Sequence, residues 1–302
     1  MSKYRLSKRL VTQLMKDVYG VPISLGSVSN AEERVSHSLE QIYVDIKTRL
    51  QQAPVVHVDE TGYKQKNKSG WAWLLASSEF TLFHLNCSRG KKVAMRLLGN
   101  LLDKTVVSDR YAAYNFISPS RHQVCWAHLK RDFQKISERN EPSGSIGRAL
   151  LKNHEDIFSF WKEHGYKGYY VHKKVRKRLR YLKNKLRKSL IRGTHCSYKM
   201  TRRTCQNILD YEQGLWLFFE KPGVSPTNNL AEQQLRPLVI SKKLSFGVQS
   251  ERGARFIERI FSLVMSCKQQ NKNPLEVLQL AIRDFFITPP PALPGILPLG
   301  AC

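Results

Sequence analysis

The chain has 302 residues, of which 41% are hydrophobic and 10% aromatic, so it can bury a sizeable core and global disorder is not expected. Lys and Arg number 50 against 24 Asp and Glu, and the formal charge of +26 favours a polyanionic partner such as nucleic acid. No apolar run approaches the ~20 residues that span a bilayer, and no signal peptide is evident, so we expect a cytoplasmic protein without a membrane partner.

Residues 1–53 carry a helical pattern. Leu10, Leu14 and Val18 recur four apart, and residues 20–24 break the run before another helical stretch. This N-terminal segment fits either a helix-turn-helix or a plain helical hairpin, because the spacing after Gly20 is looser than the usual tight turn.

Residues 54–140 change to a strand pattern and form the first part of the predicted core. A β-branched run at 55–58 ends on Asp59, and strand candidates at 71–76 and 80–85 complete a three-strand meander. A helix over 93–102 then leads to a fourth strand at 105–108, which ends on Asp109.

A fifth strand is predicted at 123–126, followed by a helix with apolar residues at helical spacing. His122, Cys125 and His128 stand three apart around this strand. A structural zinc site needs four ligands, usually in two close pairs, and no second pair is evident. The six cysteines include no pair at C-x-x-C spacing and are expected to be reduced. We therefore favour packing or hydrogen-bonding roles for these three residues over zinc binding.

Residues 141–222 are predicted to form a basic helical insertion. No acidic residue occurs between Glu163 and Asp210, while Lys and Arg crowd residues 173–192. One apolar stripe runs through this basic helix at Val175, Leu179, Leu182, Leu186 and Leu190. A run of cations without acids repels itself, so we favour contact with phosphates over a merely solvated face. The candidate DNA-binding residues are Arg176, Arg180, Lys183 and Arg187.

Residues 223–287 are predicted to form the second part of the core. Thr227 or Asn228 can cap a helix that carries Glu232, and further helices are expected over 255–268 and 274–286. Residues 288–302 are Pro-rich and are expected to be a disordered tail.

Taken together, this order of elements resembles an RNase H-like fold: an α/β protein with a mixed five-stranded sheet flanked by helices and a helical insertion before the Glu-bearing helix. In such a sheet Asp59 and Asp109 can lie side by side, with Glu232 supplied by a helix. Each acid alone is better explained as a turn, cap or surface residue. Their joint placement favours a site for two divalent metal ions, because Mg²⁺ prefers carboxylate oxygens. Phosphodiester chemistry needs two such ions to neutralise the charge on the attacking and the leaving oxygen.

Four ordered motifs add a family resemblance. They are V-H-V-D-E-T-G at 56–62, V-S-D-R-Y-A-A-Y at 107–114, C-W-A-H-L-K-R-D at 125–132, and N-N-L-A-E at 228–232 with R-P at 236–237 and S-F-G at 245–247. Over roughly residues 4–286 the chain is similar to DDE transposases of the insertion-sequence 66 family.

The resemblance implies that Asp59, Asp109 and Glu232 are the catalytic, metal-binding triad, with two Mg²⁺ or Mn²⁺ ions as cofactors. It further implies cleavage and strand transfer of an insertion sequence, acting on double-stranded DNA of element ends and target as a homo-oligomer in the bacterial nucleoid. Arg236 and Lys243 stand where related transposases place cations against DNA. Cys125 and His128 match a motif to which we assign a supporting position in the active-site wall.

Similar proteins begin with a zinc-finger-like region that binds element ends, and this sequence starts almost directly at the helical segment. We therefore expect little recognition of specific ends by this chain alone. Two other functions remain open: an RNase H-like nuclease that cuts without joining, and a truncated, catalytically silent DNA-binding remnant.

Overall fold

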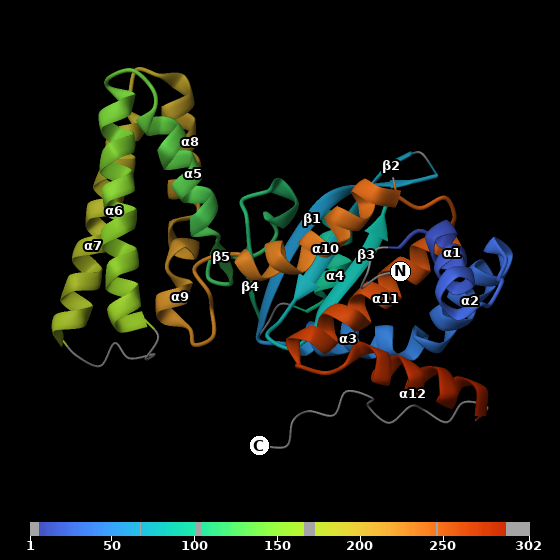
Figure 1. Ribbon diagram of the computed structural model, residues 1–302. Coiled ribbons are helices and arrows are strands. Elements are labelled where there is room, and N and C mark those ends of the chain that lie inside the picture. The colour runs from blue at the N-terminus through green and yellow to red at the C-terminus, as the bar shows by residue number, and fades with distance from the viewer. Residues whose placement is uncertain (1–5, 67, 101–103, 166–172, 246, 288–302) are drawn as a thin grey trace. The chain divides into compact units, whose positions relative to one another are not determined.

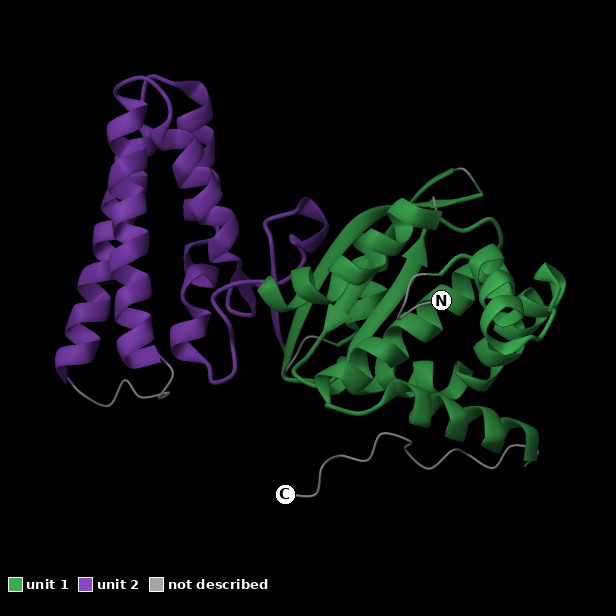
Figure 2. Cartoon of the chain, viewed as in Figure 1, with its two compact units in different colours: residues 1–104, 229–302 green, residues 105–228 purple. Residues whose placement is uncertain are grey.

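The computed structural model describes residues 6–66, 68–100, 104–165, 173–245 and 247–287. The chain forms two compact units, which Figure 2 colours separately. Unit 1 comprises residues 1–104 and 229–302, and unit 2 comprises residues 105–228. The predicted tail at 288–302 lies outside the described residues. Among the helices described, none combines the length and the apolar character that crossing a membrane requires.

Three helices open unit 1: α1 (Lys8–Tyr19), α2 (Leu25–Ser38) and α3 (Glu40–Gln52). Serine side chains cap the first two, since the Ser7 hydroxyl accepts from the Leu10 N–H and the Ser24 hydroxyl from the Ser27 N–H. The helical pattern of this segment is therefore confirmed, with the second stretch divided into two helices at Leu39.

The sheet has five strands: β1 (Val55–Gln65), β2 (Lys68–Ala76), β3 (Thr81–Asn86), β4 (Thr105–Ser108) and β5 (His122–Val124). β1, β2 and β3 form the predicted antiparallel meander, and β4 pairs with β5 in parallel. The strand order is β3-β2-β1-β4-β5. This mixed sheet with its flanking helices is an α/β RNase H-like fold, which confirms the predicted fold class.

The first strand is longer than predicted. The sequence indicated an end at Asp59, but β1 continues to Gln65 and Asp59 lies inside it, opposite Leu74 of β2. The strand persists because β2 pairs with it as far as Lys68, in a two-stranded ladder that tolerates polar side chains on one face. The residues before and after Asp59 on β1 are therefore paired with β2, which fixes the backbone that carries the Asp59 side chain.

A helix covers the edge of the sheet at β3. α11 (Glu251–Gln269) runs along this strand, and three of its side chains accept hydrogen bonds from every second backbone N–H. The Ser266 hydroxyl accepts from Thr81 at 3.0 Å, the Ser262 hydroxyl from Phe83 at 2.9 Å, and Glu258 Oε1 from Leu85 at 2.7 Å. An open strand edge is a template for unwanted pairing, so this ladder of side chains closes it.

The other helices in the described part of unit 1 are α4 (Lys91–Leu98), α10 (Asn229–Ser245) and α12 (Pro274–Ile287). α10 packs against β1 and β2, and α12 packs against α2 and α11 (Figure 1). The predicted helices over 255–268 and 274–286 are thus confirmed.

Unit 2 adds long helices to β4 and β5: α5 (Trp126–Ser137), α6 (Ser143–His164), α7 (Lys173–Thr194), α8 (Lys199–Asp210) and the short α9 (Leu217–Glu220). α5 packs against α6, α6 against α7 and α7 against α8, and Figure 1 shows α6 and α7 side by side. The fully buried Trp126 ring lies at the centre of an aromatic cluster with His154, Phe158, Trp216 and Phe218. Leu179, Leu182, Leu186 and Leu190 are buried, which confirms the apolar stripe of α7.

Candidate active site

Two adjacent carboxylates on β1 have different environments. Glu60 is buried, and its Oε1 accepts from Arg89 Nε at 2.9 Å and Nη2 at 2.7 Å. Asp59 is partly exposed, and its Oδ1 accepts from the Glu60 N–H at 2.9 Å. Because an ion pair holds Glu60 inside the unit, Asp59 is the better candidate for a ligand-binding role.

Glu232 lies in the first turn of α10 and is partly exposed. A carboxylate there is stabilised by the positive end of the helix dipole. The helix is held to β1 at its other end, where Lys242 Nζ donates to the Gly62 carbonyl oxygen at 2.7 Å. Asp59 and Glu232 are therefore carried by two elements of unit 1 that pack against each other.

In unit 2, Asp109 directly follows β4, as predicted, and its Oδ1 accepts from the Tyr111 N–H at 2.9 Å. It lines a cavity of about 300 Å³, whose other walls include Arg110, His128, Arg131, Asp132, Lys135 and Asn207.

Cations surround Asp109 in this cavity. Arg110 forms an ion pair with Asp132 and donates to Asn207 Oδ1, so its guanidinium has a defined position. Arg131 and Lys135 add two more cations on the wall formed by α5. A carboxylate among several cations suits a phosphate-bearing substrate, because the cations bind phosphate oxygens while the carboxylate can hold a metal ion.

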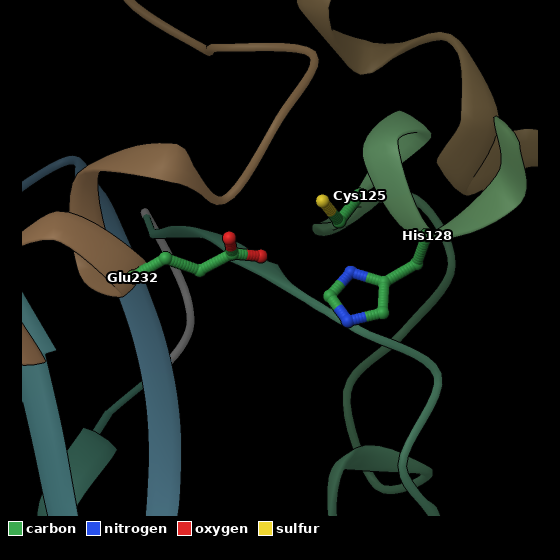
Figure 3. Close-up of side chains that lie close together, drawn as sticks. All are labelled: Cys125, His128 and Glu232. Carbon is green, nitrogen blue, oxygen red and sulfur yellow. The ribbon is translucent and has the colours of Figure 1, made fainter. Parts of the chain in front are cut away.

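Of the three residues considered for zinc, Cys125 and His128 have ligand atoms within 4.8 Å of each other, whereas His122 has partners of its own. His122 Nε2 lies 2.7 Å from the Ser108 hydroxyl, and burial, only partly opposed by Asp109, lowers the pKa of His122 to about 4. The Cys125 thiol accepts from the Asn228 N–H at 3.1 Å. His128 lines the cavity beside Asp109. Figure 3 shows Cys125 and His128 at the start of α5, and Glu232 on α10.

The chemistry of the three acids fits a hard divalent cation. Asp59, Asp109 and Glu232 each present carboxylate oxygens from a partly exposed position, and Mg²⁺ takes oxygen ligands of this kind. Asp59 and Glu232 belong to unit 1 and Asp109 belongs to unit 2.

The predicted DNA-binding cations lie on two helices. Arg236 and Lys243 are exposed on α10, and Lys243 lines a second cavity, in unit 1. On α7, Arg176, Arg180 and Arg187 are exposed, whereas Lys183 is half-buried. Two of these α7 cations have acidic partners: Lys183 Nζ lies 2.7 Å from Glu220 Oε1, and Arg187 Nε lies 3.6 Å from Glu212 Oε2.

Sequence reasoning missed most walls of the Asp109 cavity: Arg110, Arg131, Asp132, Lys135 and Asn207. A signal for three of them was present, since His128, Arg131, Asp132 and Lys135 are spaced at i, i+3, i+4 and i+7 and so share one face of α5. Asn207 comes from α8, and no local pattern connects it to Asp109.

The fold and the positions of these acids place the chain among proteins of RNase H-like fold. A mixed sheet of RNase H-like type carries one acid on its first strand and another directly after its fourth, and a third acid opens a later helix. Residues 5–256 match the family described as "Transposase IS66 family". The chain belongs to the IS66 family of transposases, which confirms the resemblance seen in its motifs.

A more distant likeness links the chain to the uncharacterized protein y4qI of Sinorhizobium fredii. The two are 22% identical over 292 residues, which is 86% of this chain and 53% of that protein. The chain thus spans about half the length of this relative.

Proposed function

We propose that this chain is the catalytic part of a transposase that cuts the DNA at the ends of an insertion sequence and joins it to a target. Asp59, Asp109 and Glu232 act as the ligands of two divalent ions, Mg²⁺ or Mn²⁺. The observation that carries the proposal is the Asp109 cavity, where a carboxylate lies among cations suited to a phosphodiester. When bound, the ions would stabilise charge on the attacking and leaving oxygens.

The protein's own groups position the substrate. Arg131 and Lys135 bind non-bridging phosphate oxygens beside Asp109. Arg110, fixed by Asp132 and Asn207, donates to the same phosphate from a direction that is set before DNA binds. Such preorganised donors lose little conformational freedom when the substrate arrives.

Double-stranded DNA is the proposed partner, and the chain works as a homo-oligomer on it. The net charge of +26 and the exposed cations of α7 support broad phosphate contact along a duplex. Phosphate contacts carry little sequence information, so element-end recognition by this chain alone should be weak.

The first test measures nicking and strand transfer on element-end DNA. We expect activity with Mg²⁺ or Mn²⁺, and a loss of more than ~100-fold for Asp59→Ala, Asp109→Ala or Glu232→Ala, because losing a metal ligand should cost more than losing an outer-shell partner. Glu79→Ala, which changes an exposed acid of unit 1, serves as the matched control and should retain activity.

The outcomes separate the three functions. Retained activity in Asp109→Ala would point to a different site. A folded protein that binds element-end DNA but is inert with both metals would identify a DNA-binding remnant, and cutting without joining would identify a nuclease.

A further inference from the structure

A second cavity, of about 370 Å³, lies in unit 1 between the β1–β2 hairpin and the C-terminal half of α10. Its volume falls within the usual range of small-ligand pockets. The residues that give it chemical character are Gly62, Lys64, Trp71, Lys242 and Lys243.

The charge of this cavity is positive. Three lysines line it, and none of its described lining residues is acidic. Lys242 is fixed by its hydrogen bond to the Gly62 carbonyl oxygen, and burial together with the neighbouring Lys243 charge lowers the pKa of its ammonium. An anion bound here would relieve this repulsion.

An aromatic ring stands beside the lysines in a fixed position. The Arg89 guanidinium lies 4.5 Å from the centroid of the Trp71 ring, and Glu60 holds that guanidinium from the other side. The cation covers one face of the indole ring, so a planar ligand would stack on the opposite face.

We propose that this cavity binds one unpaired nucleotide of DNA, with its phosphate between the lysines and its base stacked on Trp71. This inference rests on the proposed function, because it takes DNA as the partner.

The test uses the full chain without metal, so that it is independent of catalysis. The probes are a fully paired duplex, the same duplex with one unpaired 2-aminopurine nucleotide near its end, and free deoxyadenosine monophosphate. The readouts are affinity, 2-aminopurine fluorescence and the melting temperature of each variant.

We expect the unpaired probe to bind about tenfold or more tightly than the paired duplex, with quenched fluorescence, because stacking on an aromatic ring is sequence-tolerant and strong. Trp71→Leu should lose most of that preference and Trp71→Phe should restore it. Lys243→Glu should reduce the preference, while Lys68→Glu, an exposed cation of β2 outside the lining, should leave it unchanged.

A second variant guards against misfolding of the Trp71 variants. An added Cβ at Gly62 meets no atom within 4 Å, so Gly62→Val should fold while narrowing the cavity, and it should reduce the preference.

Equal affinity for paired and unpaired probes, or a preference that survives both Trp71→Leu and Gly62→Val, would overturn the inference. So would equal binding of the free nucleotide and the unpaired DNA. Absence of the preference in the wild type with cleavage intact would overturn this site alone, whereas retained cleavage in the triad variants would overturn the proposed function.

Discussion

At the scale of single residues, burial decides what chemically similar groups can do. Asp59 and Glu60 are neighbours on one strand, yet Glu60 is enclosed with Arg89 while Asp59 stays partly exposed. The motif that contains both acids predicted a site on this strand. The burial of Glu60 beside Arg89 supports Asp59 as the acid of that site, and this burial cannot be seen in the sequence.

His154 provides a prediction about pH. Burial, helped by the Lys130 charge, lowers the pKa of His154 to about 4, and its ring stacks on Phe158 with centroids 4.3 Å apart. Because the unfolded chain binds a proton more readily at this residue, stability should fall as pH drops from about 6.5 toward 4. His154→Phe keeps the stacking and removes the titration, so its stability relative to wild type should grow over that interval in urea titrations.

His195→Phe is the control, because it removes a histidine whose ring is exposed. The prediction would be contradicted if the difference in unfolding free energy between wild type and His154→Phe stayed constant from neutral pH to about pH 5.

At the scale of elements, local patterns predicted the helices and strands better than their ends. The run from Thr105 to Ser108 predicted both boundaries of β4, since no charged residue interrupts it before Asp109. The predicted β1 was too short because Gly62 and Lys64 carry little strand signal, and pairing with β2 and a bridge to Val248 keep that part extended. The Asp109 cavity depends on Asn207 from a helix far along the chain, which no local pattern could reveal.

The ladder between α11 and β3 gives a prediction about stability. Ser262→Ala should leave the buried Phe83 N–H without an acceptor and cost about 1–3 kcal/mol of unfolding free energy. The measurement is urea denaturation of the full chain.

Ser245→Ala is the matched control. Ser245 is an exposed serine of α10 whose hydroxyl donates within its own helix, so its loss should change stability by less than about 0.5 kcal/mol. Equal effects of the two substitutions on the free energy of unfolding would mean that a water molecule replaces the Ser262 hydroxyl as acceptor for the Phe83 N–H.

At the scale of the whole molecule, the net charge of +26 predicts that salt governs DNA binding. If α7 engages about 6–10 phosphates, affinity should fall by roughly 10³–10⁵ between 50 and 200 mM salt. Reversing Arg176, Arg180, Lys183 and Arg187 to Glu should weaken binding to every duplex and flatten this slope. The buried leucines of α7 should keep the fold intact.

Two of these four cations form ion pairs within unit 2, so the fourfold variant changes more than DNA binding. Lys183 and Arg187 pair with Glu220 and Glu212, so reversing them also creates repulsion within unit 2. Arg176→Glu with Arg180→Glu is therefore the cleaner change, compared by titration against random and element-end duplexes. Strong discrimination for one duplex at high salt would instead indicate base reading by residues near Ser24.

The contact of α11 with β3 also sets a limit on length. Four residues of helix advance ~6.0 Å, whereas two residues of strand advance ~6.6 Å, so the two repeats drift apart by about 0.6 Å at each step. Three contacts stay in phase, and the last of them uses Glu258, whose longer side chain spans the accumulated offset. The next position in this series on the helix is Ala254, which carries no side-chain acceptor, so the series ends at Glu258. The spacing of Glu258, Ser262 and Ser266 on α11 therefore matches a strand of six residues, which is the length of β3.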